Sequence, residues 1–154
     1  MKGSPQKTSV KPGNSSVQRK AERWVIDAFN KGRKAPAKIR PPAAPLSLHD
    51  GAQITVDAIS ADEKTVVEIY VRQGGLKPGH RRKIAMDALK LVALEGKYEH
   101  RILLFAHEPI KRELEKTNTW LAQAIKQAGI EVEVVQLGPA QKKQITQAQE
   151  RQRR

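Results

Sequence analysis

The sequence predicts a mixed α/β fold in one domain, residues 17–137, and three observations predict it. Alternating apolar and polar residues in "ITVDAIS" and "TVVEIYVR" flank a short acidic turn, which indicates a β-hairpin. The segment "HRRKIAMDALKLVALEGK" has apolar residues at helical spacing, and the short apolar run "RILLFA" is typical of a buried strand. A chain of 154 residues is long enough to bury a stable core without disulfide bonds or structural metal ions. The absence of cysteine also excludes disulfide scaffolds and thiolate zinc sites.

The N-terminal third begins with a Gly-, Ser-, Pro- and Lys-rich segment, residues 1–16, which has almost nothing to bury and which we expect to be a disordered basic tail. Apolar residues then follow helical spacing from Val17 to Phe29, and Gly32 supplies a stop, so the first helix is predicted here. The Pro-rich segment 33–45 can neither continue a helix nor join a central strand. We expect it to be an exposed, extended basic connector.

The remaining elements alternate between strands and helices. Strands are predicted over 46–49, 54–59 and 65–72, and Gly and Pro residues then break the chain before a helix over 80–97. A strand over 101–106, a helix over 108–129, a strand over 130–137 and a polar, basic C-terminal helix or tail over 138–154 complete the order. Helix, three strands, helix and strand thus form a core that a further helix, strand and C-terminal helix extend.

Positive charge is concentrated at the two ends of the chain, which has a net charge of +13. Residues 1–45 carry eleven Lys or Arg against two acidic residues, residues 46–137 carry thirteen of each sign, and residues 138–154 carry five against one. A neutral centre with basic ends is typical of a protein that binds a polyanion, and we expect DNA, with RNA left open. The same pattern also fits tails that only maintain solubility.

The predicted hairpin places two carboxylates together. If the chain turns at Asp62 and Glu63, residues whose numbers sum to about 125 face each other, and Asp57 lies opposite Glu68. Like charges directly opposite on antiparallel strands are destabilising, so the pair is either fully solvated or holds a cation. The pair is therefore a candidate cation site.

This element order, with Asp57 in "TVDA" and Glu68 in "VVEIYVR", resembles the core of the PD-(D/E)XK nuclease superfamily, the restriction-endonuclease-like fold. The resemblance covers about residues 17–106. It implies a metal-dependent endonuclease in which Asp57 and Glu68 bind Mg²⁺ or Mn²⁺, since hard carboxylate oxygens suit these cations and leave sites for water and phosphate. Superfamily members often add an acid from the first helix, for which Glu22 is the candidate, although Glu22 also fits an ordinary solvated helix position.

The chain departs from the superfamily pattern at Tyr70, where a catalytic lysine is expected. Some members carry that lysine on the following helix. Lys83, Lys90 and, in the loop before the helix, Lys77 are candidates, and Lys83 is the expected replacement. If none of them reaches the metal, the chain is a degenerate nuclease-like module that binds nucleic acid or a protein without cutting.

Further basic residues lie around the start of the helix over 80–97. The cluster "KPGHRRK" and Lys90 predict phosphate contacts; its members are Lys77, His80, Arg81, Arg82, Lys83 and Lys90. Trp24 and Trp120 occupy apolar helical faces and are expected in the core. The absence of an apolar segment long enough for a membrane span or a signal core predicts a cytoplasmic protein, and a homodimer or larger complex is left open.

Overall fold

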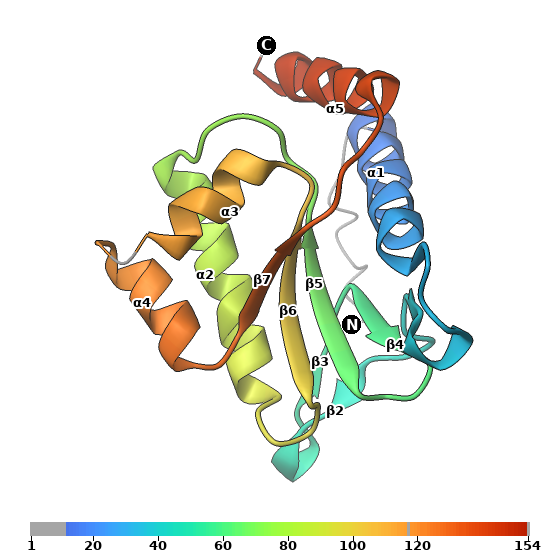
Figure 1. Cartoon of the computed structure of the whole chain (residues 1–154), viewed down its shortest axis with the longest axis vertical. Helices are drawn as coiled ribbons and strands as arrows, with labels where there is room; N and C mark the ends of the chain where they lie inside the picture. Colours follow the sequence, from blue (N-terminus) through green and yellow to red (C-terminus); the bar gives the residue numbers. More distant parts are fainter. Residues whose placement is uncertain (1–11, 117, 154) are drawn as a thin grey trace, which may run out of the picture.

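A five-stranded mixed sheet with helices on both faces forms the centre of the molecule, in a computed structural model that describes residues 12–116 and 118–153 (Figure 1). The strand order is β1-β4-β5-β6-β7, and a separate two-stranded ribbon is formed by β2 and β3. The strands are β1 (Ile39–Arg40), β2 (Leu46–Ser47), β3 (Gln53–Ile54), β4 (Ala58–Ser60), β5 (Thr65–Tyr70), β6 (His100–Phe105) and β7 (Glu131–Val134). The α-helices are α1 (Pro12–Asn30), α2 (Pro78–Ala93), α3 (Glu108–Glu115), α4 (Trp120–Gln127) and α5 (Pro139–Gln152).

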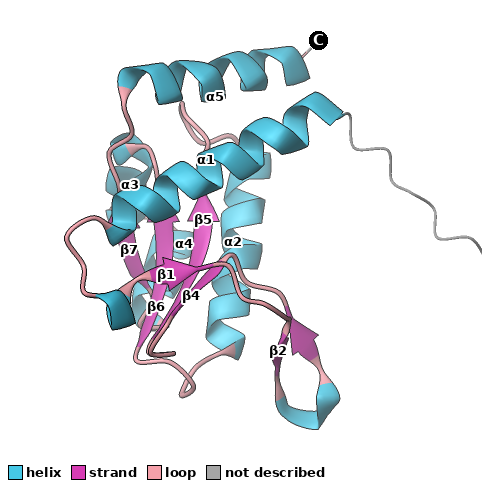
Figure 2. Ribbon diagram, turned by 90° about the vertical axis from the view of Figure 1, so that its right-hand side faces the viewer, coloured by secondary structure: helices cyan, strands magenta, loops and turns pink. Residues whose placement is uncertain are grey.

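Each face of the sheet has its own apolar core. Helices α1 and α5 lie side by side over one face, whereas α2, α3 and α4 cover the other (Figures 1 and 2). Successive side chains of a strand point to opposite faces, so Val67 and Ile69 of β5 pack on the α1 side while Val66 and Tyr70 pack on the α2 side. Because both faces of β5 are covered, a polar side chain on this strand is withdrawn from bulk water.

The hairpin of β4 and β5 has the predicted register. Ala58 lies opposite Val67 and Ile59 opposite Val66 in an antiparallel pair. The connecting turn is closed by Asp62, whose Oδ1 accepts hydrogen bonds from Ser60 Oγ at 2.5 Å and from the Lys64 backbone N–H at 3.1 Å. The turn therefore fixes which residue of β4 faces which residue of β5.

The strands before this hairpin differ from the prediction. Residues 55–57 belong to no strand, and the predicted strand over 46–49 forms part of the β2–β3 ribbon instead of the main sheet. The first strand of the main sheet is β1, which lies inside the Pro-rich segment expected to be an exposed connector. The side chain of Asn30 holds it there: its Oδ1 accepts from Ile39 N at 2.7 Å, and its Nδ2 donates to Ile39 O at 2.9 Å.

Helix boundaries also differ, and the helix predicted over 80–97 is α2, which spans Pro78–Ala93. Helix α1 begins at Pro12, so residues 12–16 are helical and not part of a disordered tail, while residues 1–11 of that predicted tail lie outside the described residues. The single helix predicted over 108–129 is two helices, because Thr119 is an N-cap whose side chain accepts a hydrogen bond from Ala122 N at 3.2 Å. Within the described ranges, none of the helices is both long and apolar enough to cross a membrane.

Helix α5 is docked onto the domain by its side chains. Ile145 is buried against the α1 side of the sheet. Gln149 accepts a hydrogen bond from Gln73 N at 2.8 Å and donates one to Gln73 O at 2.9 Å, which satisfies the backbone of the segment that leaves β5. The basic C-terminal segment predicted as a helix or tail is thus a packed helix up to Gln152.

Candidate functional site at a fork in the sheet

The sheet forks beside the second half of β5. Strand β4 pairs only with Val66 and Val67 of β5, so from Glu68 onward this edge of β5 has no partner strand. Asp57 precedes β4 at the fork, and its Oδ2 accepts a hydrogen bond from the Ile69 backbone N–H at 2.7 Å. A carboxylate thus replaces a strand partner at the point where the two strands separate.

Glu68 lies at the centre of the site and is only 2% exposed. Its carboxyl group lies beside that of Asp57, which acts on its pKa. Burial above all, then the neighbouring Asp57 carboxyl and the charge of Asp87, raise the pKa of Glu68 to about 9, against the opposing effect of Lys90. Within the described part of the chain, Glu68 Oε1 is buried without a hydrogen-bond partner. The site therefore contains an unsatisfied acceptor that a cation would satisfy.

Helix α2 supplies two lysines and a further acid. Lys90 Nζ lies 3.6 Å from Glu68 Oε1, within ion-pair range but too far for a hydrogen bond, and 4.0 Å from Asp87 Oδ1. Lys83 Nζ lies 3.6 Å from Asp87 Oδ2. Lys90, and not the expected Lys83, is thus the lysine that faces Glu68. Lys77 lies at the N-cap of α2 and forms no ion pair with an acidic side chain of the described residues.

Asp87 is a site residue to which the sequence assigned no role, although its place on one helical face with Lys83 and Lys90 could be read from the spacing. It is 5% exposed, and burial is the main cause that raises its pKa, whereas Lys83 and Lys90 act to lower it. Its spacing of four residues from Lys83 and three from Lys90 places all three on one helical face. An acid between two lysines at that spacing was a signal in the sequence, but the spacing alone does not show that the face is turned toward Glu68.

Glu22 reaches the same region from α1. Burial, followed by the charge of Asp57, raises the pKa of Glu22, while a hydrogen bond from Gln18 at 3.4 Å and the charge of Lys83 lower it. Asp57 and Lys83 are therefore electrostatic neighbours of Glu22. The acidic cluster comprises Glu22, Asp57, Glu68 and Asp87, contributed by α1, the segment before β4, β5 and α2.

A divalent metal ion fits this cluster through two carboxylates. In residues 12–116 and 118–153, no three His, Cys, Asp or Glu side chains are arranged closely enough to hold a metal ion. Mg²⁺ commonly binds proteins through one or two carboxylates and takes its other ligands from water and substrate phosphate. The unsatisfied oxygen of Glu68 and the adjoining carboxyl of Asp57 match that requirement.

The other predicted phosphate-contacting residues are divided between different surroundings. Arg81 forms an ion pair with Glu113 of α3. His80 Nδ1 accepts a hydrogen bond from Lys77 N at 3.1 Å, and burial is the main cause that lowers the pKa of His80. Arg82 is exposed on the other side of α2, in a hollow with Trp120. The "KPGHRRK" cluster is therefore not one continuous phosphate-binding surface.

The two tryptophans differ in exposure. Trp24 is partly buried against the α1-side core. Trp120 is 76% exposed, so its predicted place in the core is wrong. It occupies the first position of α4, and the helix break before it turns the indole away from the core that one continuous helix would have faced.

The chain was also compared with known proteins. No protein-family model, no curated protein and no solved structure matches it. A function for this chain therefore has to be inferred from the carboxylates and lysines at the forked edge of β5.

Proposed function

We propose that the protein is a metal-dependent nuclease that cleaves phosphodiester bonds of DNA with a metal-activated water. The single observation that carries this proposal is the pairing at the fork of the buried Glu68 with the half-buried Asp57, with an unsatisfied carboxylate oxygen of Glu68 and the ammonium group of Lys90 beside it. Metal-assisted phosphodiester hydrolysis needs carboxylates that hold the ion and a group that orients the attacking water, and the two acids and the lysine can supply these.

The arrangement of elements supports a restriction-endonuclease-like core. Along the chain α1 is followed by the antiparallel strands β1, β4 and β5, then by α2 and by β6, which is parallel to β5. Within the main sheet this is the order helix, three strands, helix, strand that the resemblance implies, but its first strand is β1 and not the strand predicted over 46–49. Asp57 and Glu68 lie on neighbouring segments of that core, at the place where the strands diverge.

Each residue of the site has a proposed role. Asp57 and Glu68 would hold Mg²⁺ or Mn²⁺, and Glu22 lies close enough to Asp57 for the charge of Asp57 to act on it. The bound ion supplies a low-pKa water and neutralises charge on the phosphate. Lys90 takes the place of the lysine absent at Tyr70, because its ammonium group lies against Glu68 and can orient the attacking water. Lys83 and Asp87 pair with each other, and Asp87 also steadies Lys90.

A cleavage assay tests this function. The protein is incubated with duplex, single-stranded and branched DNA in Mg²⁺, Mn²⁺ or EDTA, and products are resolved by gel. We expect cleavage with either metal and none in EDTA, and loss of cleavage to background in Glu68→Gln. Glu99→Gln, which changes an exposed carboxylate in the loop before β6, is the matched control and should cut like the parent. A parent that never cuts any of these substrates contradicts the nuclease proposal.

Tyr70 favours a second function, that of a nuclease-like module that binds nucleic acid or a protein without turnover. The ring packs edge-on against Phe105 with centroids 5.7 Å apart, and its hydroxyl group carries no positive charge for phosphate or water. Under this alternative the parent binds DNA in a salt-dependent way in EDTA and shows no cleavage with either metal. The same assay, combined with a binding titration, separates the two functions.

A further inference from the structure

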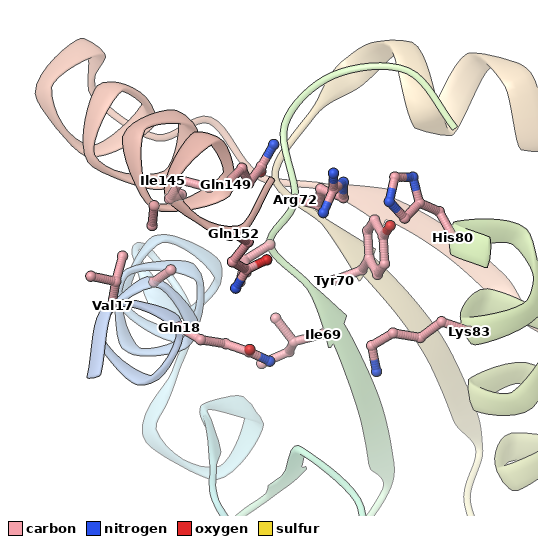
Figure 3. Close-up of a pocket in the computed structure, with 13 residues that line it drawn as sticks. Val17, Gln18, Ile69, Tyr70, Arg72, His80, Lys83, Ile145, Gln149 and Gln152 are labelled. Carbon is pink, nitrogen blue, oxygen red and sulfur yellow. The ribbon is translucent and has the colours of Figure 1, made fainter. Parts of the chain in front are cut away.

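A pocket of about 180 Å³ opens beside the acidic cluster, between α1, α5, the end of β5 and the start of α2 (Figure 3). Its two walls differ in chemistry. Tyr70, Arg72 and Lys83 lie on one side, and Val17 and Ile145 lie on the opposite side. Lys83 also pairs with Asp87, so one side chain borders both this pocket and the acidic cluster.

The polar wall contains hydrogen-bond donors that lack acceptors. Tyr70 is 6% exposed, and its hydroxyl group has no hydrogen-bond partner in the described structure. Figure 3 shows this hydroxyl group on the side of the ring nearest Arg72 and His80. Arg72 is half-buried and forms no ion pair with any carboxylate of the described residues. A buried hydroxyl and a half-buried guanidinium without acceptors favour an anionic ligand.

His80 borders the same wall, and its Nδ1 is already engaged, since it accepts a hydrogen bond from Lys77 N at 3.1 Å. Its position therefore shapes the wall, and the anion contacts fall to Arg72, the Tyr70 hydroxyl and Lys83.

We propose that this pocket binds a single unstacked nucleotide, with its phosphate at Arg72, Tyr70 and Lys83 and its base or sugar against the apolar wall. A simple anion would use only the polar wall, whereas Val17, Ile145 and the amide side chains of Gln18 and Gln152 provide an apolar and hydrogen-bonding surface opposite it. This inference rests on the proposed function, because the nucleotide would lie next to the phosphodiester held at the acidic cluster.

The size of the pocket defines the class of nucleic acid. Its volume of about 180 Å³ is below the range of roughly 300–1,000 Å³ for pockets that hold drug-sized ligands, so it accommodates part of one nucleotide and not a base pair. Unpairing a nucleotide from a duplex costs a few kcal/mol, and that cost is smallest where the base is already single-stranded. The preferred substrate is therefore DNA with an unpaired nucleotide beside the cut, such as a strand end or a junction, over continuous duplex.

The test is equilibrium binding in EDTA, with dAMP, deoxyadenosine and inorganic phosphate as probes in calorimetric titrations. We expect dAMP to bind more tightly than either fragment, and Arg72→Gln and Tyr70→Phe each to weaken dAMP binding, by about tenfold or more for Arg72→Gln. Arg23→Gln, which removes an exposed guanidinium of α1 outside the pocket, should leave dAMP affinity unchanged. Circular dichroism spectra of all three variants check that they are folded.

Three outcomes overturn the inference: no dAMP binding, dAMP binding that Arg72→Gln leaves unchanged, or inorganic phosphate bound as tightly as dAMP. These outcomes are independent of turnover, because no metal is present. If the parent binds dAMP as expected but never cuts DNA, the pocket stands and the nuclease proposal fails. If the parent cuts duplex and branched DNA equally and dAMP does not bind, the nuclease proposal stands and the pocket fails.

Discussion

Glu68 shows how one residue can be costly to the fold and useful to the site. A carboxyl group on a central strand covered on both faces loses its hydration, and the neighbouring acids add repulsion when it ionises. Its pKa is therefore raised to about 9, and the folded chain retains a proton that the unfolded chain releases near the ordinary value of 4.5. A divalent cation at the same place would reverse this preference.

The stability of the metal-free protein should depend on this proton. Because the folded state binds more protons than the unfolded state between pH 4.5 and about 9, stability falls as pH rises through that window. We expect the free energy of unfolding to decrease by up to about 1.4 kcal/mol per pH unit, and the slope to be clearly smaller in Glu68→Gln. Urea unfolding in EDTA across the window measures both slopes. Equal slopes in the two proteins would show that Glu68 does not hold the proton.

The choice between the two lysines of α2 is a second prediction at this scale. Lys90 lies 3.6 Å from Glu68, whereas Lys83 lies 3.6 Å from Asp87. We expect Lys90→Ala to lower the cleavage rate by about 10²-fold or more, the scale of a positioned proton-transfer or water-orienting group, and Lys83→Ala to lower it much less. Single-turnover rates with saturating protein measure the difference. A larger loss in Lys83→Ala would return the role to the residue that the sequence analysis favoured.

The sequence predicted the hairpin register because the acidic turn and the alternation of residues together leave one pairing. It could not predict which lysine faces Glu68, since Lys83 and Lys90 share one helical face and only packing of α2 on β5 decides between them. It also missed β1, because two residues between prolines carry no periodic signal, and the partner that holds them is the side chain of Asn30. Local pattern thus predicted the pairing of β4 with β5, but not the pairing of β1 or the contacts between distant elements.

Among the elements, α5 joins the two ends of the described chain. It lies along α1, buries Ile145 and satisfies the backbone of Gln73 through Gln149. Sequence alone indicated a polar, basic helix or tail, because one large apolar residue and two alanines in a Gln- and Lys-rich segment give no helical stripe. The docking of α5 also forms one wall of the nucleotide pocket.

Removing the apolar contact of α5 should loosen that helix. We expect Ile145→Ala to lower the free energy of unfolding by about 2 kcal/mol, at the low end for buried Ile-to-Ala changes because the helix lies at the surface. Limited proteolysis should then cut earlier near residue 138, and dAMP binding should weaken. Gln147→Ala, which changes an exposed position of the same helix, is the matched control. Unchanged proteolysis in Ile145→Ala would mean that α5 is held by its hydrogen bonds alone.

At the scale of the whole molecule, the excess of positive charge lies in the two terminal segments, whereas residues 46–137, which contain Asp57 and Glu68, carry equal numbers of positive and negative charges. Contacts between Lys or Arg side chains of these segments and DNA phosphates would supply affinity without sequence selectivity, because they neutralise phosphates and do not read bases.

Replacing Lys2, Lys7 and Lys11 by Gln should therefore weaken DNA binding without altering any preference between sequences. We expect the slope of log affinity against log salt to fall in magnitude by up to about 0.9 for each lysine that contacts phosphate. Fluorescence anisotropy over a salt series on two unrelated duplexes measures slope and preference together. If the slope is unchanged, the N-terminal lysines do not contact DNA.

The forked edge has a consequence for how molecules of this chain meet one another. A strand edge with free N–H groups is a template on which a strand of a second molecule can add, which is a route to aggregation. Asp57 already accepts the hydrogen bond of the Ile69 N–H on that edge, so its carboxyl group blocks the addition of a second strand there. We expect Asp57→Ala to scatter more light than the parent on incubation at high concentration, and Asp57→Asn, whose amide oxygen can still accept from Ile69, to stay clear. If Asp57→Asn scatters as much light as Asp57→Ala, and both scatter more than the parent, the charge of Asp57 and not its hydrogen bond keeps the molecules apart.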